Sequence, residues 1–382
     1  MQQQKKKVNF ILFFIFFFNG CFYASNQLLV NNITAAFHAS EAQMAVMIGA
    51  LYAGPMLMVL FFGPFSDRVG RKKSGIIAIF LMFIGAFFIA LIHNILFITL
   101  GFLLYGIGVG GMESVMFALT SDVNREKAGQ QLIFNQALFS IGAMLSPLLL
   151  AKILPKDRYQ IVYVFIFVLC LLACFVVYRM PFEEPKEKEA AKEPIGLLKM
   201  LKHPYLIFLM LSIIVSTGSE SAFTYWSGVF FDSVHASQLG AIALSTYWFA
   251  SILGRLLSSR VKNVEKLTFH CFALAAAGTC ILVFMPNAYL KLAGMLMVGA
   301  AFAPLYPALG YQSSRLFPNN TGAAFAIITF SSNLGGVISQ PLISGVSGRS
   351  AISNIYISIC ILCGIIAVLT LCIPQKINKK QI

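Results

Sequence analysis

The sequence predicts an all-α membrane protein whose twelve transmembrane helices form two pseudo-symmetric bundles of six helices each. Three observations carry this prediction. The 382-residue chain is 58% hydrophobic and only 11% charged, and its mean hydropathy of +0.81 lies far above that of soluble proteins. Apolar runs of about 20 residues, the length that crosses a hydrocarbon layer, recur twelve times. One long polar stretch divides these runs into six and six.

Each apolar run is predicted to be a helix, because hydrocarbon offers backbone groups no hydrogen-bond partner and each segment must satisfy its own. The positively charged start followed by a phenylalanine-rich run also resembles a secretory signal, but eleven further spans favour a first transmembrane helix. In chain order, the predicted spans lie at 8–30, 42–62, 74–92, 94–119, 128–151, 159–179, 204–231, 236–258, 265–285, 289–313, 320–346 and 350–373.

The polar stretch at 181–195 is dense in charges and bounded by prolines. We therefore predict an N-terminal six-helix bundle at 1–180, a cytoplasmic linker at 181–202 and a C-terminal six-helix bundle at 203–382. The distribution of Lys and Arg predicts the orientation. With both termini cytoplasmic, 23 of the 28 Lys and Arg residues lie on the inner side and five on the outer side. The predicted location is the cell membrane, with multiple passes.

Several partner and function classes are disfavoured by the sequence. A net charge of +14 would suggest nucleic acid in a soluble chain, but here the cations lie between apolar segments rather than on one patch. The eight cysteines lie almost all within apolar runs without His or carboxylate at ligand spacing, which favours small hydrophobic side chains over metal sites. No nucleophile motif or phosphate-binding loop indicates an enzyme. We predict a monomer in the lipid bilayer without metal or cofactor.

A charged motif, G-x-x-x-D-R-x-G-R-K-K, separates the second and third spans. Its fixed positions are Gly63, Asp67, Arg68, Gly70 and Arg71. An Asp at a helix end can face the positive N-terminus of a neighbouring helix, and Gly permits close backbone packing. The cations are expected to stay in the cytoplasm near anionic headgroups. An ordinary basic loop is the alternative, but such a loop needs no Gly and Asp at these offsets. We predict a gating motif.

The two halves are weakly similar to one another, as in transporters built from repeats. Gly108 precedes Glu113 by five positions in the fourth span, and Gly299 precedes Pro304 by five in the tenth. This spacing aligns Gly108 with Gly299. The counterpart of the charged motif, after the eighth span at Arg255, lacks the Asp. A gating latch is therefore expected mainly in the first half.

Among the 14 Asp and Glu residues, only Glu113 and Glu220 fall well inside a span. A charged side chain there costs about 2.5–3.5 kcal/mol on insertion scales, so it normally faces water or a partner. Glycines surround Glu113, and Thr217 and Thr224 flank Glu220 at i−3 and i+4. Desolvation favours the neutral acid, which suits a reversible proton carrier. The alternative is a carboxyl paired for packing, but no Lys or Arg is expected at similar depth.

The charged motif resembles that of major facilitator superfamily transporters, and motifs inside the spans resemble the fucose/proton symporter family and its sugar-transporting relatives. These motifs are Gly20 with Asn26, Gly-x-Gly-x-x-Glu ending at Glu113, Asn135-Gln136, Glu220-x5-Trp226, Trp248 before Gly254-Arg255, and Ala303-Pro304-Leu-Tyr-Pro307. The resemblance implies the major facilitator fold. It also implies that a glutamate on the fourth helix and an aspartate on the first serve proton coupling and sugar binding, and that a glutamine on the fifth contacts the sugar.

By position, these family roles fall on Glu113 and Gln136. The place of the family's aspartate is held by Gln27. An amide cannot carry a proton, so coupling rests on Glu113, alone or together with Glu220, or the protein is an uncoupled carrier.

A sugar site needs amide or carboxyl groups for hydroxyls and aromatic faces for the apolar side of the ring. The competing interpretation is that aromatic side chains are core or lipid-facing, since 13% of the chain is aromatic, and that the glycines beside Asn333 serve helix packing. Our substrate-binding candidates are Asn26, Gln27, Gln136, Trp226, Trp248 and Asn333, with Tyr247 and Gln340 as further options.

The sequence therefore predicts a secondary active transporter that moves a small polar solute, a sugar, by alternating access with proton symport. Efflux of drugs or metabolites is an alternative, although the fifth span has Pro147 without the flanking glycines that efflux antiporters of this superfamily carry. A non-transporting membrane sensor is a third interpretation, but the central linker is too short for a signalling domain.

Overall fold

The computed structural model describes residues 2–124, 128–153, 158–179, 200–258, 261, 263–317, 321–345 and 351–372. These ranges contain twelve helical segments that are long and apolar enough to cross a membrane, in the predicted order. The chain divides into two compact units, Met1–Glu189 and Ala190–Ile382, and the boundary falls within the predicted linker. The linker bounds themselves stay a prediction, because most of that stretch lies outside the described ranges.

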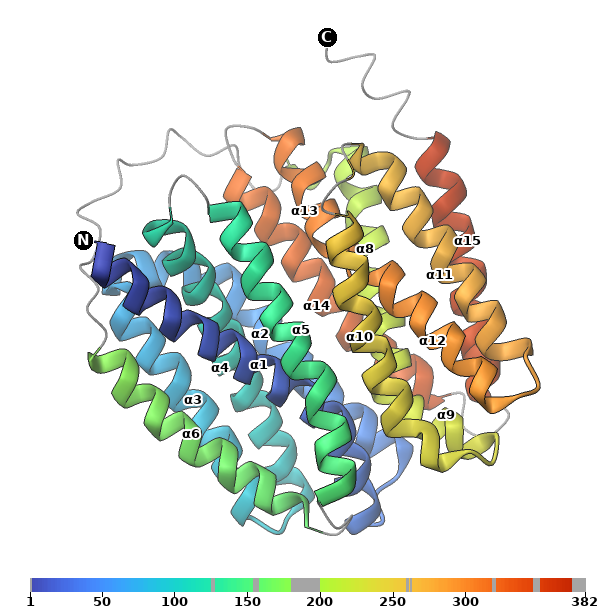
Figure 1. Cartoon of the computed structure of the whole chain (residues 1–382), viewed down its shortest axis with the longest axis horizontal. Helices are drawn as coiled ribbons and strands as arrows, with labels where there is room; N and C mark the ends of the chain where they lie inside the picture. The colour runs from blue at the N-terminus through green and yellow to red at the C-terminus, as the bar shows by residue number, and fades with distance from the viewer. Residues whose placement is uncertain are drawn as a thin grey trace. The chain divides into compact units, whose positions relative to one another are not determined.

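Six long helices account for the described part of the first unit (Figure 1). Ser40 begins the second of them with a capping box, in which its hydroxyl accepts from the Gln43 backbone amide at 3.2 Å and the Gln43 side chain accepts from the Ser40 amide at 2.9 Å. Such caps satisfy backbone amides that a helix leaves open at its start. The helices are α1 Gln2–Ala36, α2 Glu41–Val69, α3 Arg71–Leu91, α4 Ile95–Val123, α5 Ala128–Ile153 and α6 Tyr159–Arg179.

In the second unit, two of the predicted spans are broken. The seventh breaks at Trp226, whose φ of −102° and ψ of 2° end one helix and begin the next. The tenth breaks at Ala303 and Pro304, because proline lacks the amide that would continue the helix. The elements are α8 Pro204–Tyr225, α9 Ser227–Ser233, the 3-10 helix η2 Ser237–Leu239, α10 Gly240–Ser258, α11 Val264–Phe284, α12 Ala288–Phe302, α13 Leu305–Leu316, α14 Thr321–Gly345 and α15 Ala351–Cys372.

Lys291, one of the five cations assigned to the outer side, is only 5% exposed. Its ammonium donates to the carbonyl oxygens of Leu282 at 2.8 Å and Val283 at 3.1 Å, at the C-terminal end of α11. It also lies 5.5 Å from the centre of the Phe230 ring. The negative end of a helix and an aromatic face both attract a cation, so the burial of this charge is matched by partners.

The same helix pairs pack together in both units. In the first unit, α1 packs on α5, α2 on α4, and α3 on both α4 and α6. In the second, α8 packs on α14, α10 on α12, and α11 on both α12 and α15. The internal repeat that the sequence predicts is therefore present in the packing of each unit.

Glycine contacts fix the register of this repeat. A Cβ on Gly106 would lie 2.4 Å from a carbonyl oxygen of α2, and one on Gly299 would lie 2.3 Å from a carbonyl oxygen of α10. Gly85 and Gly101 approach each other across α3 and α4, as Gly278 and Gly294 do across α11 and α12. Each of these glycines in the first unit lies 193 positions before its counterpart in the second unit: 85 and 278, 101 and 294, 106 and 299. The predicted alignment of position 108 with position 299 was wrong by two residues.

Candidate functional site

Asn26 is held inside the first unit. It is 1% exposed, and its side-chain oxygen accepts a 2.6 Å hydrogen bond from the hydroxyl of Tyr163 on α6. The Tyr163 ring in turn meets the ring of Phe102 on α4 edge-to-face, with centroids 6.2 Å apart. Gln27, the next residue on α1, is fully buried. Asn26 thus joins α1 to α6, and sequence reasoning missed the tyrosine that binds it.

Glu113 lies on α4, within its predicted membrane span, and is half-buried. The glycines before it serve helix packing. A Cβ on Gly108 would lie 2.5 Å from the Ala78 carbonyl oxygen of α3, and one on Gly110 would lie 2.5 Å from the backbone of Pro55 on α2. Within the described residues, no hydrogen bond or ion pair reaches the Glu113 carboxyl group. This group is therefore an acid inside a span without a cationic partner among those residues.

Gln136 and its neighbour Asn135 have different environments on α5. Asn135 is fully buried, and its amide donates to the Thr120 hydroxyl at 3.2 Å and accepts from Gln131 at 3.2 Å. Gln136 is half-buried, and its backbone carbonyl accepts from Ser140 at 3.1 Å. Asn135 therefore ties α5 to α4, whereas the Gln136 side chain belongs to a face that is only partly covered within its unit.

Glu220 on α8 does have a cation nearby. Electrostatic interactions link it to Arg255, and the hydroxyl of Tyr247 lies within hydrogen-bonding reach; both partners are on α10. The expectation of no Lys or Arg at similar depth was wrong here, because Arg255 in the last turn of α10 interacts with Glu220. Long basic side chains can extend along a helix from its end.

The two threonines that flank Glu220 bind elsewhere. Thr217 forms a 2.7 Å hydrogen bond with the Ser332 hydroxyl of α14. Thr224 donates to the backbone carbonyl of Glu220 at 2.8 Å rather than to its carboxyl group. One of these hydroxyls therefore joins two helices, and the other binds a backbone carbonyl. The groups of this unit that interact with the Glu220 carboxyl group are Arg255 and Tyr247.

Both tryptophans are buried within the second unit. Trp226 is 1% exposed, and its indole nitrogen donates to Gln340 at 3.0 Å. The Gln340 amide donates in turn to Ser221 at 3.0 Å, so this chain of bonds joins α8 to α14. Trp248 is 2% exposed and meets the Tyr247 ring edge-to-face at 5.5 Å. Asn333 is half-buried, and its amide donates to the Thr329 carbonyl at 2.9 Å. The role of Trp226, Trp248 and Asn333 in substrate binding stays a prediction.

The charged motif forms a one-residue link between helices. α2 continues to Val69, and Gly70 alone, with φ of 98°, separates it from α3. That positive φ favours glycine. Arg71 is 5% exposed and donates to the Ser66 hydroxyl, so its side chain folds back on α2. The side chains at the remaining motif positions, Gly63, Asp67 and Arg68, lie outside the described part of the structure.

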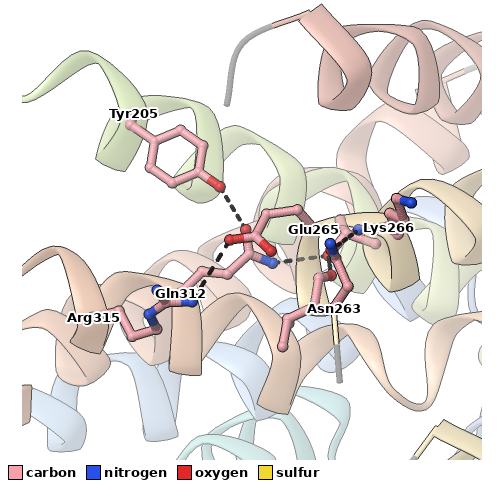
Figure 2. A network of polar contacts seen from close by, with 8 residues as sticks. Tyr205, Asn263, Glu265, Lys266, Gln312 and Arg315 are labelled. Atoms are coloured by element: carbon pink, nitrogen blue, oxygen red, sulfur yellow. Dashed lines mark hydrogen bonds and ion pairs between the residues drawn. The ribbon is translucent and has the colours of Figure 1, made fainter. Parts of the chain in front are cut away.

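A polar network that the sequence analysis missed joins α8, α11 and α13 (Figure 2). The Tyr205 hydroxyl donates to Gln312 at 2.6 Å, and the Gln312 amide donates to the Thr268 hydroxyl at 2.9 Å. Beside them, Arg315 lies 3.9 Å from Glu265. Gln312, near the end of the predicted tenth span, was the signal available in the sequence. This network ties together the ends of three helices within the second unit.

In the first unit, the corresponding contact joins Asn9 of α1 and Asn124 at the end of α4. Their amides exchange two hydrogen bonds of 3.0 and 2.8 Å. Within the described ranges, no group of three or more His, Cys, Asp or Glu residues could hold a metal ion.

Two repeated units of six spans, with an acid inside one span of each, define a membrane transporter built from an internal duplication. The chain belongs to the Major Facilitator Superfamily, whose family model matches residues 12–340. This membership confirms the fold that the motifs predict.

Individual relatives are distant but similar along most of the chain. Membrane protein MosC of Rhizobium meliloti is 22% identical over 92% of this chain and 87% of its own. The glucose/mannose transporter GlcP of Bacillus subtilis is 22% identical over 86% of each chain. Among solved structures, nucleoside transporter NupG has a TM-score of 0.80 at 13% identity, covering 96% of this chain and 99% of its own. The E. coli Fucose:proton symporter FucP has a TM-score of 0.68 at 18% identity, covering 95% and 98%.

Proposed function

We propose that the protein takes up a small hydroxyl-rich solute, a sugar, across the cell membrane by alternating access, and that proton symport through Glu113 drives the uptake. The observation that carries this proposal is the environment of Glu113 on α4. Its carboxyl group is half-buried within a span and meets no ion pair or hydrogen bond among the described residues. The charged form costs about 2.5–3.5 kcal/mol in such a place, so the neutral acid is favoured until water reaches it.

The proposed roles of the two acids differ. Glu220 interacts with Arg255 and with the Tyr247 hydroxyl, so its charge is balanced within the second unit. A paired carboxylate holds its charge more firmly than an unpaired one. We therefore assign proton coupling to Glu113 and a charge-paired positioning role to Glu220.

The solute class rests on chemistry and on similarity together. Gln136 on α5 is half-buried and offers an amide donor and acceptor suited to hydroxyl groups. The relatives with informative names are named for glucose and mannose, for nucleosides and for fucose, all of which carry several hydroxyls. Gln27, Asn333, Trp226 and Trp248 remain our further substrate-binding candidates.

The remaining parts of the proposal concern placement. Because Lys and Arg concentrate on one side of the predicted spans, we assign both termini to the cytoplasm. The link between α2 and α3 at Gly70 and Arg71 then lies at the cytoplasmic edge, where the predicted gating motif acts. The partners are protons, the solute and the bilayer, and the protein works as a monomer.

Uptake into proteoliposomes tests this function. A panel of labelled sugars and nucleosides is measured with and without an imposed proton gradient, for the wild-type protein, Glu113→Gln and Glu220→Gln. Glu41→Gln at the start of α2 is the matched control for removal of one acidic charge. We expect gradient-driven uptake of a sugar that Glu113→Gln abolishes and Glu41→Gln preserves. Uptake that depends neither on the proton gradient nor on the Glu113 substitution rejects proton coupling. Export of amphiphilic dyes without sugar uptake indicates efflux, and solute binding without flux indicates a sensor.

A further inference from the structure

The register of the internal repeat identifies the second unit's counterparts of Glu113 and Gln136. The offset of 193 positions relates α4 to α12 and α13. It also relates α5 to α14, because a Cβ on Gly142 would lie 2.2 Å from a carbonyl oxygen of α1, and one on Gly335 would lie 2.3 Å from a carbonyl oxygen of α8. Applied to positions 113 and 136, this offset gives Tyr306 and Thr329.

These two counterparts contact each other. The hydroxyls of Tyr306 on α13 and Thr329 on α14 are 2.7 Å apart and form a hydrogen bond. Both side chains are half-buried, as are those at positions 113 and 136 in the first unit. The pair is therefore polar, uncharged and only partly covered by its own unit.

The surrounding backbone is also unusual. Tyr306 follows the break at Ala303 and Pro304 that separates α12 from α13. Interrupted helices of this kind form substrate sites in transporters, because the interruption leaves backbone and side-chain groups free to bind. The Tyr306 ring is held edge-to-face against Phe325 at 5.6 Å, so its hydroxyl has a fixed direction.

The other embedded acid has a similar counterpart. Gly142 contacts Phe17 and Cys21 of α1, and its counterpart Gly335 contacts Ile214 and Gly218 of α8. Phe17 therefore corresponds to Ile214 and Cys21 to Gly218, which is an offset of 197 positions between α1 and α8. This offset makes position 23 the counterpart of position 220 in the repeat. Position 23 is a tyrosine, and its hydroxyl lies 3.2 Å from that of Tyr52. Each acid in one unit thus corresponds to a hydroxyl pair in the other.

We propose that Tyr306 and Thr329 form the second unit's binding site for hydroxyl groups of the transported solute. This inference rests on the proposed function and extends it to residues that determine specificity. A hydroxyl both donates and accepts, so the pair can exchange its internal hydrogen bond for bonds to a sugar hydroxyl. Both groups are uncharged hydroxyls, so this site contributes to affinity and leaves coupling to the first unit.

Substitutions that remove only the hydroxyls test affinity. Tyr306→Phe and Thr329→Val are compared with Tyr311→Phe, a control on the same helix whose side chain is 52% exposed. Loss of one neutral hydrogen bond is expected to raise the KM for the sugar roughly five- to tenfold. The number of protons per solute is expected to stay unchanged, and Tyr311→Phe to match the wild type. A KM in both hydroxyl variants equal to that of the control overturns the proposal.

A second measurement is independent of the solute. Tyr306→Cys and Thr329→Cys are exposed to a charged, membrane-impermeant methanethiosulfonate reagent on protein whose native cysteines have been replaced. Ile361→Cys on α15, where the side chain is 58% exposed on an apolar helix, is the control. Labelling of the two test positions but not the control is expected if they line a watery path. Absence of labelling in both proteoliposome orientations overturns the proposal. Labelling without any sugar uptake by the wild type refutes the proposed function instead.

Discussion

Replacing Gly142 by Ala is expected to weaken the packing of α1 on α5. The new Cβ would lie 2.2 Å from the Phe17 carbonyl oxygen, and ordinary contact begins at 3.4 Å, so the helices must separate by about 1.2 Å. Over-packing costs about 1–3 kcal/mol, and the upper half of that range applies because the obstacle is backbone. The better helix propensity of Ala offsets roughly 1 kcal/mol of this cost, so the free energy of unfolding should fall by about 1–2 kcal/mol.

The repeat predicts the same loss at Gly335, where the Cβ would lie 2.3 Å from the Ile214 carbonyl oxygen. Gly49→Ala is the control, because nothing lies within 4 Å of its Cβ. That variant should be as stable as the wild type or gain up to about 1 kcal/mol. The free energy of unfolding is measured by denaturant titration of purified protein in lipid nanodiscs. This expectation is refuted if both test variants have the same free energy of unfolding as the wild type, or if Gly49→Ala loses as much stability as they do. Close backbone contact then does not set the helix spacing.

Three further outcomes follow from individual contacts. Tyr163→Phe removes the hydroxyl that binds buried Asn26 and should lower the free energy of unfolding by about 1–3 kcal/mol, measured by the same titration; an unchanged value contradicts the contact. Lys291→Met leaves two carbonyls at the end of α11 without their donor and should also cost about 1–3 kcal/mol, with a stability equal to wild type as the contrary result. For Glu265 and Arg315, whose side chains are 29% and 62% exposed, a double-mutant cycle should give a coupling below about 1 kcal/mol that shrinks further with salt; a large, salt-insensitive coupling would show that the pair is shielded from solvent.

The spans could be predicted from the sequence because a bilayer demands long apolar helices and leaves few alternatives. The break at Pro304 carried a signal in its proline, whereas the break at Trp226 did not, since no residue there forbids a helix. The length of α2 was also underestimated. Its last turns carry the charged residues of the motif and extend to Val69, beyond the apolar run.

The environment of the candidate site was harder to predict. Identifying Glu113 and Glu220 required only their position within apolar runs. The partners of Glu220 depend instead on how α8 packs against α10, because Arg255 interacts with this acid from the last turn of α10. The repeat register was missed for a related reason. A glycine five residues before a special residue is a weak marker, whereas the backbone contacts of Gly106 and Gly299 are specific but appear only once the helices are packed.

Because helices in each half meet backbone to backbone at glycines, the shape of a half depends little on the side chains that point in other directions. Residues that face lipid or solute can then be exchanged without moving the framework. Relatives with 13–22% identity that match almost the whole chain are the expected product of such an arrangement. At the proposed solute-binding positions 136, 306 and 329, a few exchanges would then change the preferred cargo and leave the architecture intact.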